Sequence, residues 1–586
     1  MKKKYVRWTL WTIASPFILF IILCILIYLP PIQNFLVDKA AVYASEATGM
    51  NISVGRISLS FPLNLVVTNV DAASPHNDTL LSVRRLQVNV QLLPLLKKQV
   101  EVDGISLQGA TVNSNDLIHG MKLNGTLGEL FISSHGVALD PETAIVNKVL
   151  LKDTDLSLCL NDTAAADTAA SDTTYWKIIL QDIDLQNVSF ALDMPLDSLS
   201  LAASLDNAIL RDGLIDLHKS AYSLQTFRIE NGRVRYDNGK PLAADSLSSG
   251  LDPSHIALTD IGVKLDSLYY GGRNMKAIIS QFVLKERSGV EIVSATGRMV
   301  SNDKVLRVPS LKLETRDSYL ELNAAMDWNA LDFKDEGLVS ARLMADIGKP
   351  DVVRFMGRMD EKFVRQYPSE PLRIRTGIDG DLNKLKLTTL TAELPGALGL
   401  FARGELTHLT DSLLRGGDIT LEAETKDLKF VSTLAEGIEI PYGTRLEGKF
   451  TMAGAKMGTD LLLMQPEAQA VAAADTIPIT VYNDSISVAD DFKMERAARL
   501  FAKYDLSRDR YEADLAVNHF DLHQFMPADS LYTLSTRLKV EGEGFDFFSP
   551  RTYFNAEGGI DRFHYGSYHL TGISLAAGLE KSKVHA

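Results

Sequence analysis

Three polar side chains near the C-terminal end of the sequence are its best candidates for chemistry: His519, Asp521 and His523. On a β-strand the side chains alternate, so these three would share one face, opposite Phe520 and Leu522. Imidazole and carboxylate groups placed in this way are ligands that zinc accepts. The same spacing is also typical of the solvated face of an amphipathic strand, and we favour that interpretation. We therefore predict no metal site.

No other pattern of residues suggests catalysis. The sequence contains no H-E-x-x-H, C-x-x-C or G-x-S-x-G motif and no glycine loop of the phosphate-binding type. We predict no catalytic residue and no cofactor, and we do not expect an enzyme.

The elements that would position any such side chain are β-strands, because apolar and polar residues alternate from Asn51 onward. Residues 86–92, with the sequence LQVNVQL, alternate strictly, which is typical of a sheet with one apolar and one solvated face. Similar runs, separated by Gly, Asn and Asp, continue to the end of the chain. The fold class we predict is mainly β: a long, curled antiparallel sheet forming a repeating groove, with a few short amphipathic helices.

Several of these runs change phase once, because a three-residue gap interrupts the two-residue period. Such a gap predicts a β-bulge or bend, which increases local twist. The gaps follow the pairs Ile105 and Leu107, Ile183 and Leu185, Val263 and Leu265, Leu306 and Val308, and Leu385 and Leu387.

Three segments have apolar residues at helical spacing instead. Residues 32–48 predict a short helix that caps the first strands. Residues 351–367 predict an amphipathic helix with Val352, Met356, Met359 and Phe363 on one side, and residues 490–504 predict another. Each of the last two is expected to cover a stretch of sheet.

Residues 8–29 are long and apolar enough to cross a bilayer, and no charged residue occurs within them. Lys2, Lys3, Lys4 and Arg7 precede this run, which predicts a cytoplasmic N-terminus and an exported remainder. Trp8, Trp11 and Tyr28 lie near the ends of the run, where aromatic rings favour the membrane interface. The alternative is a cleaved signal peptide, but the run is long and lacks an A-x-A site, so we favour an anchor.

The charge of the chain argues against nucleic acid as a partner. Its 586 residues have a formal net charge of −14, and phosphate backbones repel an acidic surface. Of the two cysteines, Cys24 lies in the predicted anchor and Cys159 in a predicted strand, so we expect no disulfide.

The predicted organisation has six parts. Residues 1–31 form a basic tip and membrane anchor, and residues 32–160 the start of the β-groove with its capping helix. Residues 161–174, rich in Asp, Thr and Ala, form a flexible loop. Residues 175–350 form groove repeats, residues 351–368 the amphipathic helix, and residues 369–586 further repeats.

The sequence of residues 51–112 resembles the N-terminal region of the AsmA/TamB family. The matching segments are GRISL at 55–59, LLSVRRL at 80–86, LLPLLKK at 92–98 and VEVDGISLQG at 100–109. A single anchor directly before this region is also the family's arrangement. Weaker repeats of the same kind lie at 305–324 and 380–404, and residues 538–579 look like the repeats of TamB.

The resemblance implies a bridge-like lipid-transfer protein, anchored in the inner membrane with its bulk in the periplasm, whose apolar groove carries phospholipid. It also implies a role in outer-membrane biogenesis and an outer-membrane barrel partner of the TamA or BamA type. Proteins of the TamB type carry a further C-terminal domain that engages this partner. The sequence ends at Ala586 without one, so a truncated chain is one alternative.

Together, alternation and resemblance predict the residues that would line the groove. They are Val88, Val90, Ile105, Leu107, Ile183, Leu185, Leu320, Leu322, Leu385 and Leu387. Two other functions stay open: a scaffold that assembles outer-membrane or secreted proteins by strand addition, and, ranked last, an enzyme on a β-solenoid. An open groove and a closed β-sandwich give the same alternation, so the sequence does not distinguish them.

Overall fold

The structure is a computed structural model of the chain. It describes Lys39, Ala41, Val42 and Ser45, and then residues 50–60, 64–74, 79–91, 102–114, 121–138, 142–160, 175–239, 250–333, 337–356, 359–434, 437–466, 480–482, 485–487, 494–546, 549, 551–580 and 583–585. The chain divides into two units. Unit 1 comprises Met1–Ser246 and Asp252–Arg287, and unit 2 comprises Leu247–Leu251 and Ser288–Ala586.

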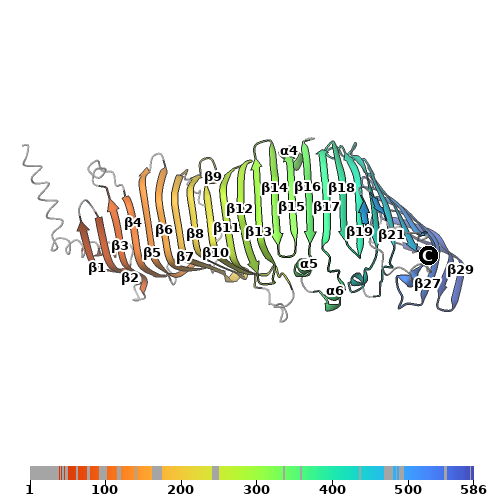
Figure 1. The fold of residues 1–586 in the computed structure, drawn as a ribbon, viewed down its shortest axis with the longest axis horizontal. Helices are drawn as coiled ribbons and strands as arrows, with labels where there is room; N and C mark the ends of the chain where they lie inside the picture. The colour runs from red at the N-terminus through yellow and green to blue at the C-terminus, as the bar shows by residue number, and fades with distance from the viewer. Residues whose placement is uncertain are drawn as a thin grey trace, which may run out of the picture. The chain divides into compact units, whose positions relative to one another are not determined.

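Unit 1 is a sheet of long strands that lie side by side (Figure 1). Its strands are β1 (Asn51–Ser60), β2 (Asn64–Ala73), β3 (Thr79–Val90), β4 (Val102–Asn113), β5 (Met121–Ala138), β6 (Thr143–Leu160), β7 (Lys177–Met194), β8 (Leu199–Asp216), β9 (Ala221–Leu224), β10 (Thr226–Asp237), β11 (His255–Gly271) and β12 (Asn274–Glu286). A short 3-10 helix, η1 (Pro195–Asp197), joins β7 to β8.

Strands that follow each other in sequence pair in this sheet, except β9 and β10. β6 and β7 pair in parallel, whereas the other pairs described in unit 1 are antiparallel. β9 and β10 together occupy the position between β8 and β11, as one strand interrupted at Gln225. The backbone N–H of Gln225 donates to Arg211 O (3.1 Å), which holds the interruption against β8.

Unit 2 continues in the same style as an antiparallel meander. Its strands are β13 (Glu291–Ser301), β14 (Val305–Thr315), β15 (Tyr319–Asp327), β16 (Leu338–Ile347), β17 (Leu372–Asp381), β18 (Lys384–Leu394), β19 (Leu398–Thr407), β20 (Gly416–Thr425), β21 (Arg445–Ala453), β22 (Lys456–Pro466), β25 (Met494–Asp505), β26 (Arg510–Asp521), β27 (Leu531–Glu543), β28 (Tyr553–Tyr565), β29 (Tyr568–Glu580) and β30 (Lys583–His585). A separate hairpin, β23 (Thr480–Tyr482) with β24 (Ser485–Ser487), contacts β19. The prediction of a mainly β protein is therefore confirmed.

The helices of unit 2 are short and lie in the connections between strands (Figure 1). They are α4 (Trp328–Leu331), α5 (Lys349–Met356), α6 (Glu361–Gln366), α7 (Lys429–Ser432) and the 3-10 helix η4 (Leu522–Gln524). The single helix predicted at 351–368 is thus two helices. Asp360 begins α6 afresh, because its side chain accepts a hydrogen bond from Lys362 N (2.6 Å) as an N-cap.

The helix predicted at residues 490–504 is wrong for residues 494–504, because β25 occupies them, and residues 490–493 lie outside the described residues. Ala498, Leu500, Ala502 and Tyr504 alternate along β25 and pair with Leu463, Leu461, Thr459 and Met457 of β22. A short apolar run does not reveal by periodicity alone whether it is helix or strand, and here the pairing with β22 and β26 decides.

Few of the residues on which the N-terminal predictions fall are described by the structure. Lys39, Ala41, Val42 and Ser45 are helical, in agreement with the predicted capping helix, and Ser45 Oγ accepts from Ile52 N of β1 (3.0 Å). The predicted anchor, with Trp8, Trp11 and Tyr28, and the predicted loop at 161–174 lie outside the described residues. No helix formed by the described residues has the length and apolarity needed to span a membrane.

The predicted phase changes are real bends of the strands. The register shifts within β11, between Val308 and Leu311 in β14, and between Leu387 and Leu390 in β18. In β4 and β7 the pairing passes over Gly109 and Asn187, whose φ angles are 61° and 51°. A left-handed residue inside a strand turns the following residues, so apolar side chains on both sides of the bend stay on one face.

In unit 1 these left-handed residues recur from strand to strand and consist of Gly, Asn and Asp, which tolerate positive φ. They are Asn69, Gly109, Asp153, Asn187, Asp212, Asn231 and Asp260. Two of them are linked across β6 and β7, where Asn187 Nδ2 donates to Asp153 Oδ1 (2.9 Å). Gly128, opposite Asp153, lets the strands approach closely: a Cβ there would lie 2.8 Å from Asp153 Cβ.

The bend at Asn187 gives a testable prediction. We expect Asn187→Val to weaken the pairing of β6 with β7, because a β-branched residue at positive φ costs about 1–3 kcal/mol and the bond to Asp153 is lost. Amide hydrogen exchange in β6 and β7 should become about tenfold faster or more. Asn187→Gly, which loses the same bond without the φ penalty, is the control and should change exchange less. Equal exchange in Asn187→Val and wild type would contradict this account of the bend.

Candidate functional site: the apolar face

In unit 1, residues paired across the strands form two rows that contain only apolar side chains. The first row is Leu59, Leu65, Val88, Ile105, Ile132, Val149, Ile183, Leu210, Phe227 and Leu265. The second is Ile57, Val67, Leu86, Leu107, Leu130, Leu151, Leu185, Ala208, Ile229 and Val263. Because paired residues point to the same side of a sheet, these rows define one apolar face of unit 1.

The opposite face of the same strands is largely polar, although Phe131, Leu150 and Ile209 also lie on it. One of its rows is Arg56, Thr68, Arg85, Gln108, Glu129, Lys152, Gln186, Asn207 and Glu230. Ion pairs connect neighbouring strands there, such as Arg211 Nη2 with Asp184 Oδ1 (3.1 Å) and Lys285 Nζ with Asp260 Oδ2 (2.8 Å). The sheet of unit 1 therefore has one apolar face and one face that carries its charged residues.

Unit 2 has the same two-sided construction. Its first row is Leu313, Leu320, Ala345, Ile374, Ala392, Leu400, Ala423, Leu446, Leu463, Ala498, Val517, Thr536, Ile560 and Ile573. Its second row is Leu311, Leu322, Leu343, Thr376, Leu390, Ala402, Leu421, Gly448, Leu461, Leu500, Leu515, Leu538, Gly558 and Leu575. Neither row contains a charged residue. These rows define the apolar face of unit 2.

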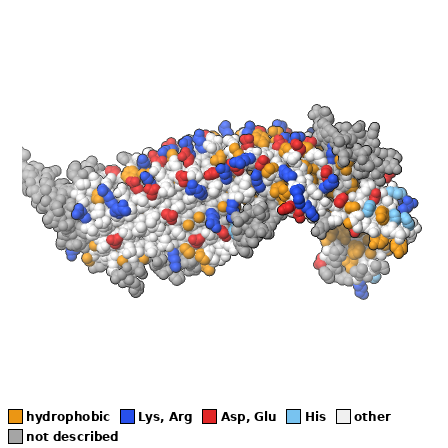
Figure 2. Space-filling model, turned by 60° about the horizontal axis from the view of Figure 1, so that its bottom comes forward, with side chains coloured by type: hydrophobic (Ala, Val, Ile, Leu, Met, Phe, Trp, Pro, Cys, Tyr) orange, Lys and Arg blue, Asp and Glu red, His pale blue; other side chains and the backbone are white. Residues whose placement is uncertain are grey.

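Charges in unit 2 lie on the other side of the strands. Arg375 pairs with Asp346 (2.7 Å) between β17 and β16, and Lys384 pairs with Glu405 (3.2 Å) between β18 and β19. Hydrogen bonds from Arg499 lower the pKa of Asp460. Figure 2 shows basic and acidic side chains intermingled over the surface that it presents.

The structure places every predicted groove residue on one of the two apolar faces. Val88, Ile105, Leu107, Ile183 and Leu185 belong to the rows of unit 1, and Val90 follows Val88 at the next position of the same side. In unit 2, Leu320 and Leu322 belong to the rows. Leu385 and Leu387 precede the bend of β18 and pair with Gly380 and Ile378 on the same side.

The apolar side chains of these rows are mostly half-exposed, which the sequence did not reveal. Among the described residues of unit 1, the buried apolar side chains are only Val67, Ala72, Leu80, Val83, Ala110 and Ala208. Ile183 and Leu185 are partly accessible, as are Leu320 and Leu322 in unit 2. A β-sandwich would bury such residues between two sheets. Within the part of the chain that the structure describes, the only second sheet is the two-stranded hairpin β23–β24, which contacts β19. No sheet of matching extent covers the rows, so an open groove describes them better than a closed sandwich.

Two clusters of described residues cover the edges of the apolar face in unit 2. Phe363 and Tyr367 pack with Phe430 of α7 against Leu394 and its neighbours, where β18 turns into β19. The rings of Phe363 and Phe430 meet edge to face, with centroids 5.7 Å apart, and Phe363 is only 1% exposed. A smaller cluster of Ala330, Val339 and Leu382 lies at the other ends of the strands, beside α4. We call the first group the α6–α7 cap.

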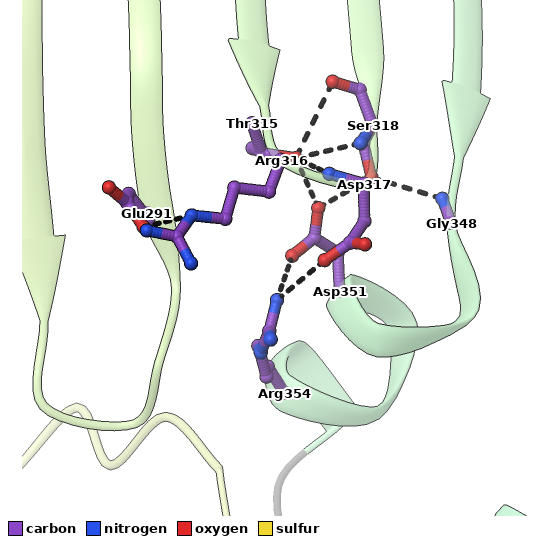
Figure 3. Close-up of polar contacts among 8 residues, drawn as sticks. All are labelled: Glu291, Thr315, Arg316, Asp317, Ser318, Gly348, Asp351 and Arg354. Carbon is purple, nitrogen blue, oxygen red and sulfur yellow. Dashed lines mark hydrogen bonds and ion pairs between the residues drawn. The ribbon is translucent and has the colours of Figure 1, made fainter.

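A buried carboxylate fixes the start of α5 beside this cap (Figure 3). Asp351 is 1% exposed and accepts hydrogen bonds from Ser318 Oγ (2.6 Å), Thr315 Oγ1 and Arg354 Nη1 (3.0 Å). Arg354 also pairs with Asp317 (3.0 Å). The α5 helix is therefore held to the turn between β14 and β15 by charge-assisted bonds, which are stronger than neutral ones.

A second cluster of charged residues lies at the same edge of the apolar face. Glu424 is 5% exposed at the end of β20; burial raises its pKa, while Arg445 (3.3 Å) and Lys426 act in the opposite direction. Burial likewise lowers the pKa of Lys426. These three charged residues lie at the ends of β20 and β21. Their arrangement does not indicate chemistry on the apolar face.

The triad His519, Asp521 and His523 does not share a strand face in the structure. His519 has a φ of 48° and directs its ring toward Arg562 (Nε2 to Nη1, 3.3 Å). Asp521 caps η4 by accepting from His523 N (3.1 Å), so the strand ends before His523. Among the described residues, no group of three or more His, Cys, Asp or Glu is placed to hold a metal ion.

No family model matches the chain, and no curated protein sequence matches it.

Proposed function

We propose that this protein is a lipid carrier of the cell envelope, anchored in the inner membrane, whose apolar faces carry phospholipid through the periplasm toward the outer membrane. The observation that supports the proposal is the uncovered, charge-free pair of rows in each unit. An exposed apolar surface of this extent is unfavourable in water and is typical of a surface that binds an apolar ligand.

Acyl chains suit this surface better than a compact ligand does. The rows run from strand to strand at a spacing of about 4.8 Å, so they offer an extended strip of contact instead of a closed pocket. Each methylene group removed from water contributes about 0.8 kcal/mol. The polar headgroup would remain at the edge of the sheet, in water. The anchor belongs to the same proposal and rests on the apolar run at residues 8–29. The periplasmic location and an outer-membrane barrel partner also belong to it, and they rest on the sequence resemblance.

The proposal is tested by the lipids that the protein retains. The full chain is extracted in mild detergent, purified, and its bound lipids are quantified by mass spectrometry. We expect phospholipid in excess of that retained by an unrelated single-anchor protein purified in parallel. Equal amounts in both preparations would refute lipid carriage and would favour the alternative of a strand-addition scaffold, which needs no bound lipid.

A further inference from the structure

A cross-strand histidine pair on the polar face of unit 2 carries an inference that is independent of lipid binding. His564 of β28 and His569 of β29 are direct partners in the hairpin, and their ring centroids lie 4.1 Å apart with 24° between the ring planes. Phe563 and Leu570, the next pair along, point to the other side of the sheet. Figure 2 shows histidine side chains exposed at this end of the molecule.

The hairpin holds the pair in place. Its turn, Gly566 and Ser567, is tied to the preceding connection by a hydrogen bond from Gly566 N to Ser530 O (2.8 Å). On its other side the ring of His564 stacks on Tyr532 of β27 (centroids 4.6 Å apart), and Tyr532 stacks on His523 (4.9 Å). The position of the His564 ring is therefore fixed before any ligand arrives.

The protonation of His564 follows from its hydrogen bond. Its Nε2 lies 3.1 Å from Gly566 O, and because a carbonyl oxygen only accepts, Nε2 carries the hydrogen. In the neutral ring Nδ1 then holds the free lone pair. Metal-binding histidines commonly donate their second nitrogen to a carbonyl in this way, which fixes the tautomer. His569 is exposed, and no bond to its ring nitrogens is described from the residues around it.

We propose that His564 and His569 form a surface site for a divalent transition metal such as Zn²⁺ or Cu²⁺. Imidazole is a preferred ligand of these ions, at about 2.0–2.1 Å for zinc. Side chains directly opposite each other on antiparallel strands have Cβ atoms about 4.5–5.5 Å apart, so a small turn of the exposed His569 ring brings both nitrogens to one ion. Water completes the coordination. His523 is not a ligand, because the Tyr532 ring lies between it and His564.

The test is calorimetric titration of the full chain, prepared without a histidine tag, with Zn²⁺. We expect one site per chain that His569→Ala weakens at least tenfold and that His564→Ala/His569→Ala removes. His523→Ala is the matched control: it shortens the ring stack but keeps both ligands, so it should bind like wild type. Because protons compete with the metal for imidazole nitrogen, binding should also weaken toward pH 5.

Electron paramagnetic resonance with Cu²⁺ gives a second measurement that does not depend on affinity. We expect a signal from two coordinated nitrogens in wild type and in His523→Ala, and its loss in His569→Ala. The proposal is overturned if the double variant binds Zn²⁺ as tightly as wild type, or if the Cu²⁺ signal is the same in all variants. The proposed lipid carriage is measured separately and survives either outcome.

Discussion

Lipid capture falls about tenfold or more when Leu320 and Leu322 both become aspartate. The two leucines lie next to each other on the apolar face of unit 2, opposite Leu313 and Ala345 and opposite Leu311 and Leu343. An ionised carboxylate is strongly disfavoured next to an acyl chain, because it loses its hydration without gaining a partner. The two substitutions also interrupt both apolar rows at β15, so an acyl chain cannot pass this strand on an uncharged path. Photo-crosslinking to labelled phospholipid measures the effect.

The matched control adds a negative charge to the same strand on its other side. Asn323 directly follows Leu322 in β15 and pairs with Arg342 on the polar face. Asn323→Asp should therefore crosslink lipid like wild type. In unit 1, Val88→Asp/Val90→Asp and Asn89→Asp form an equivalent set, because Asn89 separates the two valines of β3. Undiminished crosslinking in the leucine variant, with circular dichroism unchanged, would contradict lipid carriage on this face.

The sequence predicted the sidedness of the sheet because sidedness is a local property. In β7, the alternation of Ile183 and Leu185 with Asp182 and Asp184 predicts which side chains share a face of the sheet. The phase change at Asn187 predicts the bend. Both features follow from the two-residue period of a strand and the few residue types that accept positive φ. The predicted groove residues therefore lie together on the apolar faces.

Features that depend on distant contacts were not predictable in the same way. The parallel pairing of β6 with β7 and the shared position of β9 and β10 arise from pairing choices that alternation does not encode. The openness of the apolar face depends on whether another layer covers it, and the same alternation serves a sandwich. The histidine pair at 564 and 569 was missed because its members meet only through the hairpin, although a tight turn at Gly566 was a signal that could have suggested it.

The expectation that His519, Asp521 and His523 share one strand face was wrong for a local reason. The prediction assumed one straight strand through all three residues. A left-handed residue at His519 and the start of η4 at Leu522 each break that assumption, so the side chains diverge. Short-range spacing predicts a shared face only where the strand is regular, which sequence alone does not guarantee.

Replacing Phe363 by alanine should loosen the α6–α7 cap and leave the strands paired. The Phe363 ring is almost fully buried and contacts both Tyr367 and Phe430, with centroids 5.6 and 5.7 Å away. Removing such a ring from a packed cluster costs about 3–5 kcal/mol, through lost burial and the cavity left behind. We expect faster amide exchange in α6 and α7, while exchange in β17 to β19 changes little, since those strands also pair with their neighbours.

Phe355→Ala is the matched control, because Phe355 lies on the neighbouring helix α5 with 57% of its surface exposed. Removing the Phe355 ring should change the free energy of unfolding by less than about 0.5 kcal/mol. Comparing both variants in the lipid crosslinking measurement separates two roles for the cap. It covers Leu394 and Leu398 at the strand ends, one position beyond the row residues Ala392 and Leu400. If the cap only stabilises this edge, Phe363→Ala keeps lipid capture while its local exchange rises. A parallel loss of lipid capture would instead place the cap within the binding surface, and the apolar face of unit 2 would then include α6 and α7.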